Sequence, residues 1–522
     1  MTPTPRLIHL LPATLALSLI GARGAAAQIV IVDGDSLVDA VATASDGETI
    51  IIQSDSTFEG TLSWSSKELT IRAGFGYSPT VKGDFDSAAI SLGSTSTPTV
   101  ANLKGLRIVR GDFAPTSSPG FAAIFSGTGS GTLQGICSFQ DCTLLGDVSV
   151  SGTGDFGFEL ELDGSTLLGD LLLSGTGDSQ KAVQVHSNSR VGQVYIGPTS
   201  NAVVSLMVAD SRIVGGIEAS AALNAVATGA IRRSRIEGPV TAAQSSTSQV
   251  DILIESTLIT GDGSGTGVFS TAGAQVEGVN LTVTGFDIGL DAGLGAQFAN
   301  LALFGNGVDL APVVLPIQIA TSLIEDGTYA GFSGNFGGTP AVDSNFALTA
   351  DSIGIDAGNS MHPELGAGDL NGDARVQDSD GDGVATVNVG AIETLAPCVL
   401  AAFEYFNGSG ANPTFYTVDQ APALGASLVA TVATNPSTVA TIVALGNRSA
   451  SPLVLPGFQG ELLLELAPFP LLDVATGVHV IPVPDDASLC GAIIDTQALR
   501  ADLLGFGLVI RAGNGARLTL GE

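Results

Sequence analysis

Residues Asp141–Asp155 read DCTLLGDVSVSGTGD, and Gly164–Asp178, 23 positions later, read GSTLLGDLLLSGTGD. Each stretch holds short runs of β-forming residues between Gly, Ser, Thr and Asp, and helical periodicity is absent. The glycine after Leu-Leu recurs at intervals of 23 or close to 23, at Gly146, Gly169, Gly192, Gly215, Gly238, Gly261, Gly285 and Gly305. A strand of this size cannot bury its own face, whereas stacked coils form a continuous core. The repeat therefore predicts structural coils and not a duplicated active site.

This period predicts an all-β fold whose main part is a right-handed parallel β-helix of about 23 residues per rung. Leucine-rich repeats share the period, but their L-x-x-L-x-L-x-x-N spacing is absent. Four places before the marker glycine, small polar residues are expected to bond from rung to rung at a turn. This polar column contains Cys142, Ser165, Asn188, Ser211, Ser234 and Thr257.

Charged residues also recur in register. Asp210 and Arg233 occupy equal positions in neighbouring units, as do Arg232 and Glu255. Because neighbouring rungs lie about 4.8 Å apart, such opposite charges can pair. We therefore interpret the basic cluster IRRSR (Ile231–Arg235) as a solvated ladder, with a site for an anionic saccharide as the alternative.

The composition is strongly acidic, with 51 acidic and 19 basic residues and a formal charge of −32 over 522 residues. This charge argues against binding to nucleic acid or anionic lipid. It is compatible with divalent cations or with a well-solvated exterior. Charged residues make up only 13% of the chain, and 68 residues are glycine, which is typical of a β-rich, turn-rich protein and not of a disordered one.

The first 27 residues predict export. Arg6 precedes an apolar run from Leu7 to Ile20, and Ala25-Ala26-Ala27 supplies the small residues of a cleavage site. We expect residues 1–27 to be a signal peptide and the mature chain to begin at Gln28; a retained anchor is the alternative. No later apolar run is long enough for an integral membrane span. The expected location is secreted or at the cell surface.

Four cysteines fit an oxidising compartment. Cys137 and Cys142 are close enough in sequence for a local bridge, and Cys398 with Cys490 could close the C-terminal region. Neither pair has the spacing of a metal site.

The N-terminal part of the mature chain predicts a cap for the open end of the solenoid. Leu37, Val38, Val41 and Ala42 suit a short amphipathic helix that ends at Asp46-Gly47, and TIII begins the first strand. This helix, the DGETI turn, F-x-G at Phe58–Gly60 and ELTIRAG resemble the opening of exported right-handed β-helix proteins. The resemblance implies that the helix covers the first rung.

A second segment, residues 351–393, resembles the choice-of-anchor Q segment that closes many bacterial β-helix proteins. The matching positions are Ile355-Asp356-Ala357-Gly358, Asp369, Gly372, Arg375 and Gly390-Ala391-Ile392-Glu393, whereas Asn388 stands where an Asp is usual. The resemblance implies a surface or exported architecture and does not imply catalysis. We therefore expect the β-helix domain to comprise residues 28–396. Residues 351–393 would form its Asp-rich closing segment.

The same segment offers candidate calcium ligands. Carboxylates at alternate positions of a tight turn can converge on one hard cation. Val389 stands where an EF-hand needs its bidentate acid, and Ala374 stands where the overlapping run needs glycine. One calcium site built from some of these residues is the functional interpretation, and a solvated loop partly neutralised by Arg375 is the alternative. The candidates are Asp369, Asn371, Asp373, Asp378, Asp380 and Asp382.

After Cys398 the 23-residue period stops and about seven strands of six to eight residues follow, including GFGLVIRAG and ARLTLGE as separate strands. They predict a small antiparallel β-sandwich over 397–522. The runs TIVALGNRS, HVIPVPDDASLCGAIIDTQAL and GLVIRAGNGARLTL resemble a C-terminal domain that recurs on exported bacterial proteins. Its position there implies attachment, sorting or partner contact.

Catalytic candidates are few. Parallel β-helices include polysaccharide lyases, glycoside hydrolases and non-enzymes, so residues must decide the function. Among the histidines after residue 27, we expect His362 and His479 to lie at the surface. His186 shares its register with Asp163 and forms with it the best acid/base pair, although a structural contact is the favoured interpretation. The Asn-Thr-Asp, Asp-Asp, Gly-His-Gly and Arg-Ile-Lys elements of the polygalacturonases are absent.

These observations favour a non-enzymatic exported or cell-surface protein for recognition, adhesion or surface architecture, with polysaccharide or other surface components as partners. The alternative is a carbohydrate-active enzyme, a polysaccharide lyase or glycoside hydrolase, acting along the β-helix wall. The two hypotheses require different side chains on the outer surface of the β-helix. A groove with clustered acids and an Arg or His favours the enzyme, and a wall of Ser, Thr and Val favours the non-enzyme.

Overall fold

The computed structural model describes residues 28–85, 87–94, 98–111, 121–129, 135–245, 247–380, 382, 384–394, 400–455, 457–465, 471–485, 489–505 and 507–521. The predicted signal peptide, residues 1–27, and the predicted domain boundary after residue 396 lie outside this part of the chain. The described residues of Met1–Gln377 and Val384–Thr394 form one compact unit, called unit 1. Those of Asp378–Gly383 and Leu395–Glu522 form unit 2.

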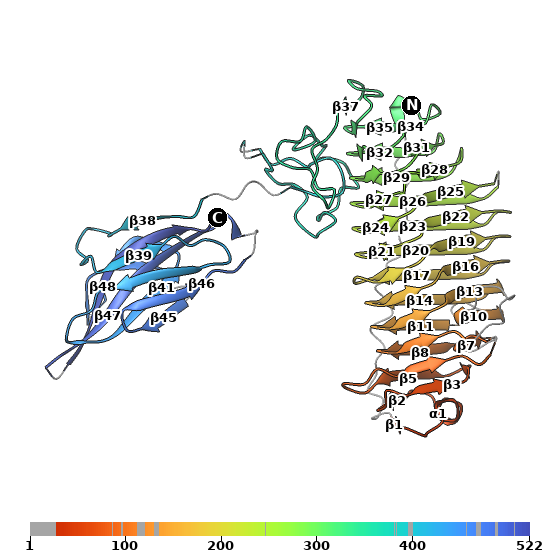
Figure 1. The fold of residues 1–522 in the computed structure, drawn as a ribbon, viewed down its shortest axis with the longest axis horizontal. Coiled ribbons are helices and arrows are strands. Elements are labelled where there is room, and N and C mark those ends of the chain that lie inside the picture. Colours follow the sequence, from red (N-terminus) through yellow and green to blue (C-terminus); the bar gives the residue numbers. More distant parts are fainter. Residues whose placement is uncertain are drawn as a thin grey trace. The chain divides into compact units, whose positions relative to one another are not determined.

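Unit 1 is a parallel β-solenoid of about 12 turns over residues 28–324 (Figure 1). Its described strands form three parallel sheets, one strand of each sheet per regular turn. The first sheet contains β1 (Gln28–Ile31), β2 (Glu48–Ile52), β5 (Glu68–Ala73), β8 (Thr99–Lys104), β11 (Gly135–Gln140), β14 (Gly157–Asp163), β17 (Gln180–His186), β20 (Val203–Ala209), β23 (Val226–Arg232), β26 (Gln249–Glu255), β29 (Gln275–Val279), β32 (Gln297–Ala299) and β35 (Ile319–Ala320).

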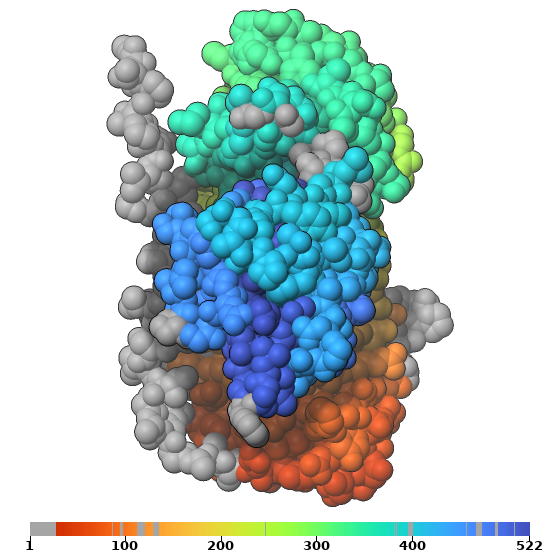
Figure 2. Space-filling model, turned by 90° about the vertical axis from the view of Figure 1, so that its left-hand side faces the viewer, coloured from red at the N-terminus to blue at the C-terminus, as the bar shows by residue number. Residues whose placement is uncertain are grey.

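The second sheet contains β4 (Leu62–Trp64), β7 (Ile90–Ser94), β10 (Phe121–Gly129), β13 (Asp147–Gly154), β16 (Leu171–Gly175), β19 (Val194–Pro198), β22 (Ile217–Ala221), β25 (Val240–Gln244), β28 (Thr266–Ser270), β31 (Ile288–Ala292) and β34 (Val308–Leu310). The third contains β3 (Thr57–Glu59), β6 (Thr80–Lys82), β9 (Arg107–Val109), β12 (Thr143–Leu145), β15 (Thr166–Leu168), β18 (Arg190–Val191), β21 (Arg212–Ile213), β24 (Arg235–Glu237), β27 (Leu258–Thr260), β30 (Thr282–Thr284), β33 (Ala302–Leu303), β36 (Leu323–Ile324) and β37 (Phe336–Gly337). The first turns (red and orange) and the last turns (green) lie at opposite ends of the stack (Figure 2).

The two stretches with the repeated sequence are consecutive turns, as the period predicts. Leu144 pairs with Leu167, and Val150 pairs with Leu173. All four side chains point into the continuous core of unit 1. The marker glycines stack on one another, and a Cβ at Gly169 would lie 2.4 Å from the carbonyl oxygen of Gly146. A side chain cannot fit between the turns there, which explains why glycine recurs.

The polar column runs along the corner between the first and third sheets, and its predicted members are buried except for Asn188, which is exposed. The backbone N–H of Cys142 donates to Ser165 Oγ at 3.0 Å, and that of Ser165 donates to Ser189 Oγ at 3.0 Å. Ser189 and not Asn188 therefore takes the third place in the column. The turn that contains Asn188 is one residue longer before this corner, and Asn188 adopts a left-handed conformation (φ 63°).

A short helix, α1 (Leu37–Thr43), lies at the N-terminal end of the solenoid (Figure 1). Ser36 caps it by accepting a hydrogen bond from the backbone N–H of Asp39 at 3.1 Å. Leu37 and Val41 are buried and Val38 packs against the core, as predicted, whereas Ala42 is exposed and Ala40 is buried. The first strand is β1, before the helix, and not the TIII run, which forms β2.

Residues after the last regular turn pack back along the flank of the solenoid. Leu348, Val389 and Ile392 contribute to apolar clusters with residues of β27, β33 and β36. Asn280 Nδ2 donates to the carbonyl of Asn388, and Asn300 Nδ2 donates to the carbonyl of Asn359. The segment with the predicted closing role thus contacts several successive turns. A short 3₁₀ helix, η1 (Pro316–Gln318), precedes β35.

Unit 2 consists of antiparallel sheets, as predicted. One sheet has the order β38 (Ala402–Phe406), β48 (Gly507–Thr519), β47 (Ile493–Leu504), β41 (Thr438–Gly446) and β45 (Leu471–Ala475), and β43 (Phe458–Gln459) joins β48 in parallel. The others are β39 (Tyr416–Gln420), β40 (Ser427–Val432) and β46 (Val478–Pro482), and the pair β42 (Arg448–Leu453) and β44 (Leu462–Leu464). Buried residues of β39 and β40 share one core with those of β41, β47 and β48.

The predicted strands GFGLVIRAG and ARLTLGE are one strand, β48, and their separation was wrong. The intervening Gly-Asn-Gly continues the strand with a shift in register between Gln497 and Leu499 of β47, and its glycines lie beneath aromatic rings. A Cβ would lie 2.6 Å from Phe415 at Gly513 and 2.5 Å from Phe406 at Gly515.

The predicted bridge between Cys137 and Cys142 is not formed, because both are free, buried thiols. Cys137 points into the core from β11, whereas Cys142 lies in the corner column and its Sγ donates to the carbonyl of Leu103 at 3.4 Å. Burial raises the pKa of Cys142 to about 11. Cys490 is disulfide-bonded, and its predicted partner, Cys398, lies outside the described residues.

Candidate functional site

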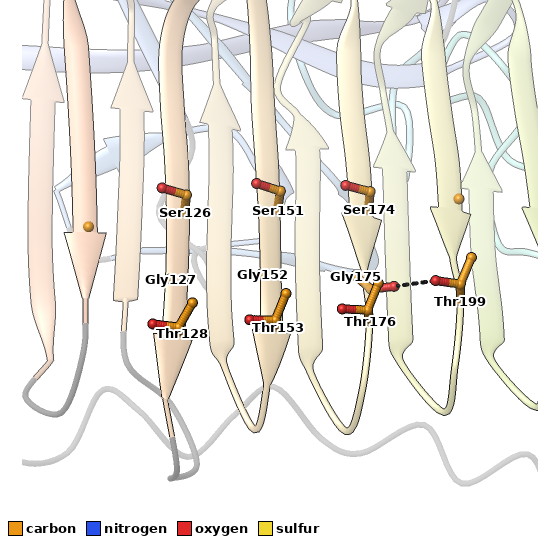
Figure 3. Close-up of a pocket in the computed structure, with 12 residues that line it drawn as sticks. Ser126, Gly127, Thr128, Ser151, Gly152, Thr153, Ser174, Gly175, Thr176 and Thr199 are labelled. Atoms are coloured by element: carbon orange, nitrogen blue, oxygen red, sulfur yellow. Dashed lines mark hydrogen bonds between the residues drawn. The ribbon is translucent and has the colours of Figure 1, made fainter.

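A groove with a volume of about 540 Å³ runs across the outer face of the second sheet, where β10, β13, β16 and β19 end. Ser126 pairs with Ser151, and Thr128 pairs with Thr153. The serine and threonine side chains form two parallel rows on one face of these strands (Figure 3). The lining consists entirely of glycine, serine and threonine: Gly93, Ser126, Gly127, Thr128, Ser151, Gly152, Thr153, Ser174, Gly175, Thr176, Gly197 and Thr199. We call this surface the hydroxyl wall.

The repeated S-G-T sequence explains the wall. Alternate residues of a strand point to opposite faces, so the serine and the threonine point outward and the glycine between them points inward. Phe156 fills the space beneath the glycines and is 1% exposed. A Cβ at Gly127 or at Gly152 would lie 2.2 Å from its ring. The wall therefore depends on small inward residues as well as on its hydroxyl groups.

This packing predicts unequal effects of two Gly→Ala substitutions in the wall. Gly152→Ala is expected to lower the free energy of unfolding of unit 1 by about 1–3 kcal/mol, because the new methyl overlaps the Phe156 ring. Gly197→Ala is the matched control, since nothing lies within 4 Å of its Cβ position. Urea unfolding monitored by circular dichroism measures both. Equal effects of the two substitutions would contradict the packing described.

A buried lysine lies behind the wall. Lys181 points inward from β17, is 2% exposed, and donates from Nζ to Ser179 Oγ at 3.0 Å. Its Nζ lies 5.9 Å from the centroid of the Phe156 ring, and burial lowers its pKa to about 8. Sequence reasoning missed this residue, although the alternation in QKAVQV places Lys181 on the same face as the buried Val183 and Val185.

The wall can bind hydroxylated or amide-bearing ligands but offers no acid or base. Serine and threonine hydroxyls both donate and accept hydrogen bonds and rotate to suit a partner. Thr199 Oγ1 already donates to the carbonyl of Gly175 at 3.4 Å (Figure 3). Ser126, Thr128, Thr153, Ser174 and Thr176 are exposed. No titratable side chain is among the residues that line the groove.

The predicted acid/base pair lies on the first sheet. Asp163 on β14 pairs in register with His186 on β17, which confirms the predicted juxtaposition. His186 Nδ1 lies 3.5 Å from Asp163 Oδ1 and 2.9 Å from Ser187 Oγ, and its Nε2 lies 2.9 Å from Glu161 Oε1. Glu161 was missed, although the alternation in FELELD turns Glu161 and Asp163 to the same outer face. Both ring nitrogens thus already have protein partners.

The basic cluster forms the predicted ladder of ion pairs, but the ladder is not solvated throughout, because Glu255 is 2% exposed. Arg233 makes two hydrogen bonds of 2.7 Å to the carboxylate of Asp210. Arg232 pairs in register with Glu255, and its Nε lies 3.4 Å from Glu255 Oε2. These guanidinium groups are therefore paired with acids of neighbouring turns, which weakens the alternative of an anionic saccharide site.

The calcium candidates fall into two groups. Asp369 is fully buried, and its carboxylate accepts hydrogen bonds from the backbone N–H groups of Asn371, Asp373 and Glu393 at 2.8–2.9 Å. It thereby organises a turn. The second group, Asp378, Asp380 and Asp382, lies in the Asp378–Gly383 segment assigned to unit 2, where the N–H of Asp382 donates to Asp380 Oδ1 at 3.0 Å. Calcium binding stays a prediction.

Arg375 does not neutralise a solvated loop. It is 1% exposed, and Nη1 donates to Glu393 Oε1 at 2.6 Å while Nη2 donates to the carbonyls of Gly390 and Ala391. Its Nε donates to Ser256 Oγ at 3.3 Å. Burial, opposed by Arg375, raises the pKa of Glu393 to about 7. This buried pair joins two parts of the segment after residue 350, and the bond from Arg375 to Ser256 attaches that segment to the flank of the solenoid.

The expectation that His479 lies at the surface was wrong. His479 is fully buried between Asp473 and Thr441, with Nδ1 2.7 Å from Asp473 Oδ2 and Nε2 3.0 Å from Thr441 Oγ1. Thr441 is also buried, and its hydroxyl accepts from the N–H of Gly477 and donates to the carbonyl of Ala475. This arrangement therefore stabilises the β45–β46 connection. His362 is partly buried, which lowers its pKa.

These features define a parallel β-solenoid protein with a hydroxyl-lined outer groove and an antiparallel β domain. Comparison with protein-family models, curated proteins and solved structures finds no match. Among the described residues, no helix has the length and apolar content needed to cross a membrane.

Proposed function

We propose that this chain is a non-enzymatic exported or cell-surface protein whose hydroxyl wall recognises a hydroxyl-rich polymer, such as a neutral polysaccharide. The observation that carries this proposal is the lining of the groove, which presents rows of serine and threonine hydroxyls and no titratable side chain. General acid–base catalysis needs a titratable group within reach of the substrate. The wall supports binding and offers no such group.

The repeat of the wall suits a polymer more than a single sugar. Adjacent strands are separated by about 4.8 Å, so a chain lying along the stack meets equivalent hydroxyls at each turn. Each hydrogen bond contributes about 0.5–1.5 kcal/mol, and several along one polymer add up to a specific but reversible interaction. Adhesion or surface architecture is consistent with such binding.

The resemblance of residues 351–393 to the choice-of-anchor Q segment supports the surface location, and the proposed signal peptide at 1–27 supports export. Unit 2 then serves in attachment or partner contact. These assignments are part of the same proposal.

A carbohydrate-active enzyme is the second candidate, because His186 lies between two carboxylates on the exterior of the first sheet. The side chains of His186, Asp163 and Glu161 are 25%, 29% and 40% exposed, so a substrate can reach them. Their contacts with one another also fit a structural ladder, since Ser138 on the preceding turn donates from Oγ to Glu161 Oε2.

Removal of wall hydroxyls tests the binding proposal. The triple variant Thr128→Val, Thr153→Val and Thr176→Val preserves side-chain shape and is expected to weaken binding to the recognised neutral polysaccharide at least tenfold. The matched control replaces Thr80, Thr143 and Thr166, which face outward on the third sheet, by valine. Co-sedimentation of the chain from residue 28 with insoluble neutral polysaccharides measures binding. Absence of binding to every polymer, or equal binding by both triple variants, would contradict the proposal.

A further inference from the structure

Unit 2 contains a second concave site, with a volume of about 730 Å³. Its walls come from β42, β44, β48 and the loop after β38. The side chains that carry chemistry here are Arg448, Arg517, Glu461, Ser409 and Ser449, and Pro452 and Leu463 add apolar surface. Two arginines in one pocket are unusual in a chain with 19 basic and 51 acidic residues.

The two arginines of the pocket differ in whether a carboxylate of the protein already pairs with their guanidinium group. Arg517 is paired with Asp495, to which Nε and Nη2 donate at 2.9 and 3.1 Å. The guanidinium of Arg448 instead lies over the Phe406 ring, 4.4 Å from its centroid. Among the described residues, no carboxylate forms an ion pair with it. The ring holds the guanidinium in place while its N–H groups stay available to a planar anion.

The pocket also contains hydrogen-bond acceptors. Glu461 accepts hydrogen bonds from the backbone N–H of Ser409 at 3.0 Å and from its hydroxyl at 2.7 Å. These bonds lower the pKa of Glu461, so it is a carboxylate at neutral pH. A fixed carboxylate can accept further hydrogen bonds from ligand hydroxyls. Ser449 also lines the pocket, and its hydroxyl already donates to the carbonyl of Ser451 at 2.8 Å.

We propose that this pocket binds a uronic acid residue of an acidic saccharide. The ligand carboxylate pairs with the Arg448 guanidinium, and the ring hydroxyls donate to Glu461. A simple anion uses only the first contact, and a neutral sugar uses only the second. The site is separate from the hydroxyl wall and goes beyond the function proposed for it, since it recognises an acidic ligand through unit 2.

Calorimetric titration of the chain from residue 28 with trigalacturonate, galactotriose and acetate tests this proposal. Trigalacturonate is expected to bind at least tenfold more tightly than either of the other two. Arg448→Gln is expected to weaken that binding about tenfold or more, because a charge-assisted pair is lost. Arg107→Gln, at an exposed position on β9, is the charge-matched control and should leave it unchanged.

Glu461→Gln separates sugar recognition from attraction of any anion. If Glu461 accepts ligand hydroxyls, this variant binds trigalacturonate more weakly; if only charge matters, it binds more tightly, and the proposal is overturned. Undetectable binding of trigalacturonate, or binding equal to that of acetate or galactotriose, also overturns it. Melting temperatures of the variants verify folding.

The wall variant with three threonines replaced should retain trigalacturonate binding, so failure of one proposal is distinguishable from failure of the other.

Discussion

Replacement of Arg375 by methionine is expected to lower the free energy of unfolding of unit 1 by about 3–5 kcal/mol. The substitution leaves Glu393, which is fully buried, without its guanidinium partner, and it removes donors from the carbonyls of Gly390 and Ala391. Breaking a buried pair by removing one member is far more costly than removing an exposed pair. Hydrogen exchange of residues 384–394 should detect the loss directly, because this segment is held by the pair.

Arg233→Met provides the matched control. Arg233 and Asp210 form an ion pair with good geometry, but their side chains are 32% and 47% exposed. We expect a cost of about 1 kcal/mol or less for that variant. Equal effects of the two Arg→Met substitutions would contradict the structural role assigned to Arg375. The double variant Arg375→Met with Glu393→Gln should recover part of the loss, because glutamine carries no charge and can still accept from the N–H of Asn388.

The same pair predicts a pH dependence. Because the pKa of Glu393 is raised in the folded chain from its ordinary value near 4.5 to about 7, the folded state holds this proton more tightly than the unfolded state. The contribution of Glu393 to the free energy of unfolding is therefore greatest below pH 4.5, falls as pH rises to about 7, and is constant above it. In Glu393→Gln this component should be absent. A wild-type chain and a Glu393→Gln variant with the same pH profile would contradict this account.

Phe156→Ala is expected to lower the free energy of unfolding of unit 1 by about 3–5 kcal/mol. The Phe156 ring stacks on Phe158 with centroids 6.0 Å apart, and Phe158 stacks on Phe125 at 4.9 Å. Removing the ring leaves a cavity beneath Gly127 and Gly152 and takes away the aromatic neighbour of the buried Lys181. The hydroxyl wall above should lose order, so binding through the wall should weaken as well.

Phe75→Ala is the control for this prediction, because Phe75 is fully exposed and buries no ring on folding. Its expected effect is below about 0.5 kcal/mol. Urea unfolding of both variants, with hydrogen exchange across β10 and β13, makes the comparison. If Phe156→Ala lowered the free energy of unfolding of unit 1 by less than about 1 kcal/mol, the prediction would be contradicted. The Phe156 ring would then not be tightly packed beneath the glycines.

Much of the solenoid could be predicted from sequence because its contacts are periodic. A single interval of 23 residues places Asp163 beside His186 and Arg232 beside Glu255, and both pairs are in register in the structure. The same reasoning failed where a turn changed length, so Asn188 was assigned a position that Ser189 occupies. Glu161 was missed because its contact with His186 is diagonal and does not follow equal register.

Contacts that do not follow the 23-residue repeat could not be predicted from the sequence in this way. Arg375 bonds to Ser256, which lies 119 positions earlier, and no pattern in the sequence links the two. The expectation of a solvated Arg375 rested on its acidic neighbours in sequence, whereas its burial is decided by the flank of the solenoid. Likewise, Gly513 and Gly515 resemble a turn in the sequence, because the rings that cover them belong to Phe415 and Phe406, which are far away along the chain.

The central claim is that the wall binds a neutral polysaccharide without converting it, and the chain length of the bound polymer tests this claim most directly. The polymer that binds the chain from residue 28 is recovered after prolonged incubation, and its length is measured by size-exclusion chromatography with light scattering. The account predicts an unchanged length with the wild-type chain and with His186→Ala. Shortening by the wild-type chain that disappears in His186→Ala would contradict it and would establish the enzyme instead.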